Sequence, residues 1–161
     1  MGQQASRVIA ASSAEVWAVV SDITRIGERS TETYLCEWDE GQQPGLGATC
    51  TGYNRYGEIE WSNRATITEW VPESRLTWDV SLMGPMAERF GTDAVTRWGF
   101  VIEPIETGVR LVEATEDMRP DDLRALAVKH LPPEVGADRL QRNYETMEAT
   151  LDAIAEVCER R

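Results

Sequence analysis

The sequence predicts an α+β fold in which an antiparallel sheet of seven strands curls around a long C-terminal helix. A short β-branched segment near the N-terminus leads directly into a helical pattern, and residues 32–116 follow a two-residue period broken by turn signals. The last part of the chain carries a single apolar stripe at helical spacing. A sheet curved around a helix leaves space beneath it, and side-chain volume, which periodicity does not give, determines whether that space is a cavity or is filled.

The N-terminal segment is expected to be a strand followed by one or two short helices. Residues 7–11 include β-branched Val8 and Ile9, and the next residues, Ser12 and Glu15, have the spacing of a capping box. One helical face then collects Val16, Trp17, Val20 and Ile23. Gly27 is the expected end of this helical region.

Six further strands fit between residues 32 and 116. Turn signals at 41–47, 56–57, 72–74, 84–85 and 106–108 separate them. Apolar side chains alternate with polar ones on three of these strands, which gives each an apolar face. The three faces contain Leu76, Trp78, Val80 and Leu82; Trp98, Phe100 and Ile102; and Val109, Leu111, Glu113 and Thr115.

The C-terminal part is predicted to be helical. Residues 121–130 form a short helix that ends at Pro132 and Pro133, and a longer helix begins near Ala137. Its apolar residues step by three and four, so one face of this helix should lie along the sheet. They are Ala137, Leu140, Tyr144, Met147, Leu151, Ile154 and Cys158.

Composition excludes several classes of function. Sixteen Lys and Arg against 28 Asp and Glu give a net charge of −12, which repels nucleic acid and anionic membranes. Cys36, Cys50 and Cys158 contain no C-x-x-C pair, and His130 is the only histidine, so we expect no zinc ribbon, metal site or cofactor. Neither a membrane span nor a signal peptide is expected, which predicts a cytoplasmic protein without membrane insertion.

Several short segments, taken in their order and spacing, resemble the START-like, or helix-grip (SRPBCC), superfamily and in particular its polyketide cyclase/dehydrase and lipid-transport branch. The resemblance covers nearly the whole chain. The matching segments are Val8-Ile9-Ala10-Ala11, Ala14-Glu15-Val16-Trp17, Ser21-Asp22-Ile23-Thr24, Gly27-Glu28, Pro44-Gly45-Leu46-Gly47-Ala48, Gly52-Tyr53-Asn54-Arg55, residues 70–78, Gly108-Val109-Arg110-Leu111 and Met147-Glu148-Ala149-Thr150-Leu151.

The resemblance implies that residues 1–161 form one START-like domain with a largely apolar cavity, and it implies ligand binding more firmly than catalysis. It also makes a homodimer the expectation. Members of this branch often have Gly-Glu-Trp-Ser-Pro-Glu after the first helices, where this chain has Arg29 for Trp and Thr31 for Pro. The chemistry at the cavity mouth is therefore expected to differ.

The candidate ligand-binding residues are mainly aromatic or apolar. An inward indole offers flat apolar area and one N–H, although the same orientation also serves core packing. Trp78 and Trp98 are the preferred pair. The full apolar set is Trp38, Trp61, Trp78, Trp98, Phe100, Leu111, Tyr144, Met147 and Leu151, and Met83 and Met86 beside the Gly84-Pro85 turn are expected to form a lip over the mouth.

Four polar residues complete the candidate site. Glu113 shares a strand face with Val109 and Leu111, so burial would raise its pKa and make it a general acid or base; the alternative is an ion pair with an arginine. Asn54, Arg55 and Arg64 are on two predicted central strands, where a guanidinium facing inward could hold a ligand carboxylate. Glu113 and Arg64 are the best candidates for catalysis.

Three functional hypotheses follow. The leading one is a protein that binds a small hydrophobic molecule, aromatic or polycyclic and polyketide- or lipid-like, between the sheet and the last helix. The second is an aromatase or cyclase that uses the same cavity. The third is a module that binds a protein partner and has a filled core.

Overall fold

The computed structural model describes residues 2–130 and 133–160. The strands are β1 Gln3–Ile9, β2 Thr33–Trp38, β3 Thr49–Tyr56, β4 Ile59–Val71, β5 Arg75–Leu82, β6 Ala94–Ile105 and β7 Gly108–Asp117. The helices are α1 Ser13–Val20, the 3-10 helix η1 Ile23–Glu28, α2 Gly84–Phe90, α3 Asp121–His130 and α4 Pro133–Glu159.

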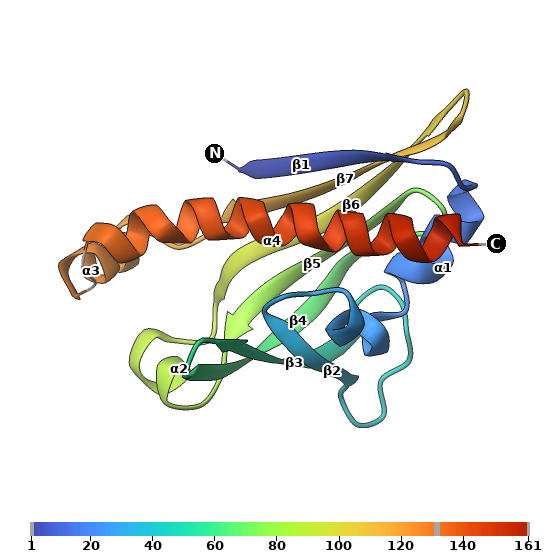
Figure 1. Cartoon of the computed structure of the whole chain (residues 1–161). Helices are drawn as coiled ribbons and strands as arrows, with labels where there is room; N and C mark the ends of the chain where they lie inside the picture. Colours follow the sequence, from blue (N-terminus) through green and yellow to red (C-terminus); the bar gives the residue numbers. More distant parts are fainter. Residues whose placement is uncertain (1, 131–132, 161) are drawn as a thin grey trace.

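The seven strands form one antiparallel sheet in the order β1-β7-β6-β5-β4-β3-β2. The sheet curls beneath α4, which crosses its concave face (Figure 1). The predicted α+β class, the seven strands and the long C-terminal helix are confirmed. The Ser12–Glu15 capping box is also present, because Ser12 Oγ accepts from the Glu15 amide and the Glu15 carboxylate accepts from the Ser12 amide.

The core lies where the C-terminal half of α4 meets β1, β7 and α1. Met147, Leu151 and Ile154 of α4 are almost completely buried there, as are Ile9 of β1 and Leu111 of β7. The N-terminal part of α4 extends past the end of β1 (Figure 1). The predicted apolar stripe is therefore buried only along the C-terminal half of α4, which lies over the sheet.

Bulges shape the sheet. The β4–β5 register shifts between Ile67 and Glu69, so the side chains that face inward change from odd to even positions along β4. Ala65 and Ile67 are buried before the shift, and Trp70 packs on the core after it. A second shift occurs between Val80 and Ser81 on β5. Because bulges increase local twist, they favour a strongly curved sheet.

Three boundaries differ from the sequence-based expectation. The predicted Gly84-Pro85 turn is the start of helix α2, because Pro85 occupies the first turn of a helix, where its missing N–H is tolerated. α4 begins at Pro133 for the same reason, four residues before the predicted Ala137. Gly27 lies inside η1 and does not end it. The side chain of His130 lies outside the described residues.

Gly27 allows η1 to lie directly against β2. A Cβ at this position would be 2.2 Å from the carbonyl oxygen of Tyr34 and 2.8 Å from its carbonyl carbon, both of which are backbone atoms. Only glycine fits this approach without a shift of the backbone. Across the residues that the structure describes, no helix is long and apolar enough to cross a membrane.

We predict that Gly27→Ala destabilises the protein by roughly 1–3 kcal/mol, because the added methyl group overlaps the Tyr34 carbonyl. Urea-induced unfolding followed by circular dichroism measures the change. Arg25→Ala on the exposed side of η1 is the matched control and should change the free energy of unfolding by less than about 0.5 kcal/mol. Equal stabilities of the two variants would contradict the close packing of η1 on β2.

Candidate functional site

A cavity of about 150 Å³ lies between the concave face of the sheet and α4. Most of its lining is apolar. The side chains that line it come from α1, η1 and the loop after it, all strands except β1, and α4. This volume is about that of five water molecules in the liquid, and an apolar cavity of similar size is large enough for one benzene ring.

An aromatic wall on β5 and β6 forms one side of the cavity. Trp78 and Trp98 are direct cross-strand partners, and the Phe100 ring lies 5.8 Å from that of Trp78. All three line the cavity. Their alternation with outward residues places them on one face, as the sequence predicted. Flat, apolar surface of this kind favours the stacking of a ring compound.

Glu113 brings a carboxyl group to the same cavity. It is 5% exposed, and its Oε2 atom has no hydrogen-bond partner among the described residues. Burial raises the pKa of Glu113 to about 8, because the charged form loses its hydration. The alternative of an ion pair with an arginine is not observed among the described side chains. At neutral pH Glu113 is therefore mainly a neutral acid that can donate one O–H.

Asn54 contributes a second unpaired polar atom from β3. Its Oδ1 accepts from Thr33 Oγ1 at 2.7 Å, which orients the amide. The Nδ2 atom is buried and has no partner in the described part of the chain. Asn54 is 4% exposed and lines the cavity beside its cross-strand partner Trp61. The cavity therefore contains a second buried donor, on a strand distant from β7 in the sheet.

The η1–β2 end of the cavity is more polar. Arg29 is 9% exposed, lines the cavity and donates from Nη2 to the Asp22 carbonyl at 2.8 Å. Burial lowers the pKa of its guanidinium. Cys36 and Cys50 also line this end, and the hydrogen bond between their thiols lowers the pKa of Cys36 and raises that of Cys50. Arg29 thus places a cation in the cavity wall.

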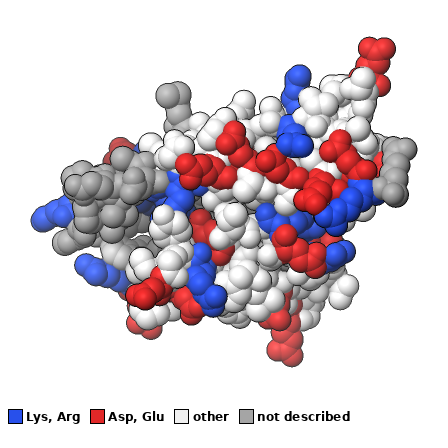
Figure 2. All heavy atoms as spheres, in the orientation of Figure 1, with Lys and Arg blue, Asp and Glu red and all other residues white. Residues whose placement is uncertain are grey.

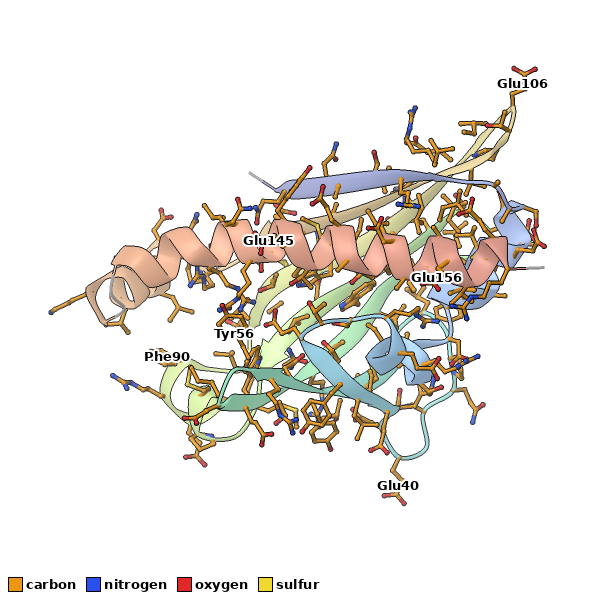
Figure 3. All side chains as sticks on the ribbon, in the orientation of Figure 1. Glu40, Tyr56, Phe90, Glu106, Glu145 and Glu156 are labelled. Atoms are coloured by element: carbon orange, nitrogen blue, oxygen red, sulfur yellow. The ribbon has the colours of Figure 1, made fainter. Side chains whose placement is uncertain are left out.

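Side-chain contacts close the gap between α4 and the β2–β3 edge. Arg139 Nη1 lies 3.2 Å from Glu32 Oε1, and Thr31 Oγ1 lies 3.4 Å from Thr146 Oγ1. The Arg142 guanidinium carbon lies 3.7 Å from the centre of the Tyr56 ring, and Figure 3 shows Tyr56 beneath the N-terminal half of α4. Because Glu32, Arg139 and Thr146 also line the cavity, these contacts mark its mouth.

The two predicted inward arginines point away from the cavity, which corrects that expectation. Arg64 lies between cavity-lining Asn63 and Ala65 on β4, so its side chain is on the outer face, where it pairs with Asp39 at 3.2 Å. Arg55 pairs with Glu60 at 2.6 Å and is more than half exposed. Strand parity explains both positions, since adjacent residues face opposite sides of a sheet.

The apolar candidates divide into two groups. Trp61, Trp78, Trp98 and Phe100 line the cavity. The other candidates do not line it: Trp38, Leu111, Tyr144, Met147 and Leu151.

The core and the end of the sheet account for this second group. Trp38 packs edge-on against Trp70, and Leu111, Met147 and Leu151 fill the core beneath α4. Tyr144 is 41% exposed, because it belongs to the part of α4 that extends beyond the core.

The expected methionine lip is also absent from the cavity lining. Met83 caps the start of α2 and is half-buried, and Met86 is half-exposed on that helix. Figure 3 shows Phe90 of the same helix on the side of the molecule that carries Tyr56. α2 replaces the expected Gly84-Pro85 turn, so Met86 lies on a helix, Met83 lies at the start of that helix, and neither lines the cavity.

Sequence reasoning missed many of the residues that line the cavity. Among them are Val20, Ile23, Ile26, Ser30, Glu32, Thr33, Cys36, Cys50, Asn63, Ala65, Arg139, Thr146 and Thr150. The alternation of side chains along β2 and β3 could have identified Cys36 and Cys50, because both are small apolar residues at inward positions on these adjacent strands. Thr146 and Thr150 were not predicted because they are polar, although they lie next to the apolar stripe and face the cavity.

Comparison with known proteins identifies relatives of this architecture. The model of the polyketide cyclase / dehydrase and lipid transport family matches residues 3–159. A polyketide-cyclase-like protein from Corynebacterium glutamicum, known from a solution structure, is 28% identical with a TM-score of 0.60; the match covers 98% of this chain and 89% of that chain. No curated protein sequence matches significantly.

Two crystal structures of lower identity share the fold. A protein from Chromobacterium violaceum is 16% identical with a TM-score of 0.67, and the match covers 99% of both chains. The Zhui aromatase/cyclase from a Streptomyces species is 16% identical with a TM-score of 0.69, and the match covers 100% of this chain and 94% of that chain. These similarities confirm the fold predicted from the sequence.

We predict that Glu113 makes stability depend on pH. Above about pH 4.5, its ordinary pKa, the unfolded chain releases the Glu113 proton, whereas the folded chain keeps it up to about pH 8. The free energy of unfolding should therefore fall by about 1 kcal/mol per pH unit across this window and level off above it. Urea unfolding at several pH values should show that Glu113→Gln removes this slope, and an unchanged slope would contradict the buried carboxyl.

Proposed function

This chain belongs to the polyketide cyclase / dehydrase and lipid transport family, and we propose that it binds a small, mainly apolar ring compound in the cavity between the sheet and α4. The observation that supports this most directly is the aromatic wall of Trp78, Trp98 and Phe100 along the cavity. The hypothesis of a module with a filled core does not fit this void. The proposal treats the matched residues 3–159 as one ligand-binding unit.

The cavity volume limits the size of the ligand. Pockets for drug-sized molecules have volumes of about 300–1,000 Å³. A cavity of about 150 Å³ fits a compound of one ring, or two small rings, better than the polycyclic molecule that the sequence also suggested. A longer ligand would have to extend through the mouth beside Arg139 and Glu32.

Removal of apolar surface from water supplies the affinity. At about 25 cal/mol per Å², enclosing a ring compound with roughly 200 Å² of apolar surface contributes about 5 kcal/mol before the losses of ordering. Polar groups in the cavity wall then select among ring compounds of similar size. Dissociation constants from micromolar to millimolar are expected.

The charge distribution supports a small molecule over nucleic acid. Figure 2 shows acidic side chains along the exposed face of α4. The exposed acidic residues of this helix include Glu145, Glu148, Asp152 and Glu156. A surface of this sign repels a phosphate backbone. The homodimer and the cytoplasmic location stay predictions.

We predict that filling the cavity abolishes binding without unfolding the protein. Ala65 lines the cavity, and Ala65→Leu adds three carbon atoms to the void. Titration of the wild type with toluene and indole by ligand-observed NMR should detect binding, and the same titration of Ala65→Leu should show at least a tenfold loss. The loss is expected because the new side chain occupies the volume needed by the ring.

The control for this experiment is Val71→Leu, a substitution at an exposed position of the same strand. It should bind both compounds like the wild type. The proposal would be overturned if the wild type bound neither compound, or if Ala65→Leu bound them as tightly while circular dichroism showed an intact fold.

A second candidate function is acid-assisted cyclisation or dehydration of a bound ligand. It is favoured by Glu113, a buried carboxyl group that stays protonated near neutral pH and faces the cavity. A general acid contributes about 10²–10⁴-fold to a rate when its pKa lies near the working pH. The similarity to an aromatase/cyclase supports testing this function.

If this function is present, Glu113→Gln should reduce turnover of a linear polyketide-type thioester at least 100-fold while leaving binding intact. Product formation followed by chromatography measures the change. Arg64→Met is the matched control, because Arg64 lies on the outer face and should not affect turnover. Equal rates of the wild type and Glu113→Gln would exclude this role for the carboxyl group.

A further inference from the structure

Two buried polar atoms in the cavity wall lack a partner. Glu113 Oε2 and Asn54 Nδ2 each have less than 1 Å² of exposed surface and no hydrogen bond within the described chain. Leaving a buried polar group unpaired costs roughly 1–3 kcal/mol. Such groups are rare in folded proteins, so two of them facing one cavity point to a ligand that pairs with them.

Both groups offer hydrogen-bond donors. The Asn54 carbonyl oxygen is already occupied by the Thr33 hydroxyl at 2.7 Å, which leaves its amide N–H groups unpaired. Glu113 keeps its proton at neutral pH because it is buried and no described ion pair stabilises its charged form. A protonated carboxyl group presents an O–H that needs an acceptor.

The other charged groups around the cavity have partners. Arg139 pairs with Glu32 at the mouth, and Arg29 donates to the Asp22 carbonyl. Ala5 and Phe100 flank Glu113 on the neighbouring strands, so the strands beside it bring no charge at these positions. A ligand in the cavity can therefore supply the partner that the neighbouring strands do not offer to Glu113.

The sheet register places the Glu113 donor next to the aromatic wall. Phe100 is the direct cross-strand partner of Glu113, and Trp98 lies two residues before it on the same face of β6. Cross-strand neighbours have Cβ atoms about 5 Å apart. A ring that stacks on Trp78 or Trp98 consequently has a substituent within reach of the carboxyl group. Asn54 faces the cavity from β3, with β4, β5 and β6 between it and β7.

We infer that the ligand is a ring compound with an acceptor oxygen, such as a ketone or ester carbonyl, that accepts a hydrogen bond from Glu113, and that the amide of Asn54 binds a second acceptor oxygen at the far end. This inference rests on the proposed function, because it concerns the ligand of the same cavity. It deepens that function by assigning the polar chemistry of the ligand and the residues that select it.

Acetophenone and ethylbenzene test the Glu113 half of the inference. The two probes have the same ring and nearly the same size, and they differ by a carbonyl group in place of a methylene. The ratio of their dissociation constants is measured by ligand-observed NMR for the wild type, Glu113→Gln and Glu113→Leu. Comparing this ratio between variants cancels the different hydrophobicity of the two probes.

Glu113→Leu should shift the ratio of dissociation constants by at least fivefold against acetophenone, because the carbonyl of acetophenone loses the Glu113 donor beside the aromatic wall. Glu113→Gln should keep the ratio within about twofold, since its amide also donates. Glu116→Gln, an exposed position near the end of the same strand, is the control and should match the wild type. An unchanged ratio in Glu113→Leu, or equal losses in the Leu and Gln variants, would overturn the inference.

A second measurement does not depend on the folding of Glu113→Leu. The carbonyl carbon of ¹³C-labelled acetophenone bound to the wild type should resonate downfield of its position in an aprotic solvent, as expected for a carbonyl that accepts a hydrogen bond. A resonance at the aprotic position would contradict the inference. If ethylbenzene binds and the acetophenone results are negative, the inference fails and the proposed function stands; if neither probe binds the wild type, both fail.

A second pair of probes tests the Asn54 half. 4-Methoxyacetophenone and 4-ethylacetophenone differ by an ether oxygen in place of a methylene at the end of the ring opposite the carbonyl. Asn54→Leu should shift the ratio of the two dissociation constants at least threefold against the methoxy compound, because the ether oxygen loses the Asn54 donor. Glu60→Gln on the exposed surface should not change this ratio. An unchanged ratio in Asn54→Leu would remove Asn54 from the proposed recognition.

Discussion

The rest of this structure depends on one constraint: α4 packs tightly against the β1–β7 end of the sheet and not against the β2–β3 end. Met147, Leu151 and Ile154 lock the C-terminal half of the helix against β1, β7 and α1. On the β2–β3 side, the contacts with α4 are an ion pair, a hydroxyl contact and a cation–π contact. Because the sheet curves away from the helix between these two sides, apolar side chains from β4, β5 and β6 face a void that the helix does not fill.

This arrangement determines the chemistry of the cavity. A carboxyl group on β7 at the edge of the void is removed from water without gaining an ion pair, so its neutral form is favoured. The Asn54 amide is held on one side by Thr33 and open to the cavity on the other. In the proposed function, apolar enclosure supplies the affinity for a ring, and the same enclosure makes two ordinary polar residues the hydrogen-bond donors that select the ligand.

Arg29 and Thr31 make one end of the cavity polar. Arg29 is buried in the cavity wall and is held by the Asp22 carbonyl, and Thr31 contacts Thr146 across the mouth. A cation in the wall and a hydroxyl pair at the mouth make this cavity more polar at its η1–β2 end than at its aromatic wall.

The sequence by itself determined the α+β class and the alternation of faces along the strands, because hydrophobic periodicity follows directly from the geometry of a helix or strand. It grouped Trp78, Trp98, Phe100 and Glu113 on strand faces with apolar neighbours, but it did not decide which face of each strand lines the cavity. Only the tertiary structure decided that Arg64 points outward, that Tyr144 lies beyond the core and that Asn54 and Glu113 face one void. These facts depend on bulges, on sheet curvature and on the overhang of α4, which arise from contacts between segments far apart in the chain and leave no local pattern.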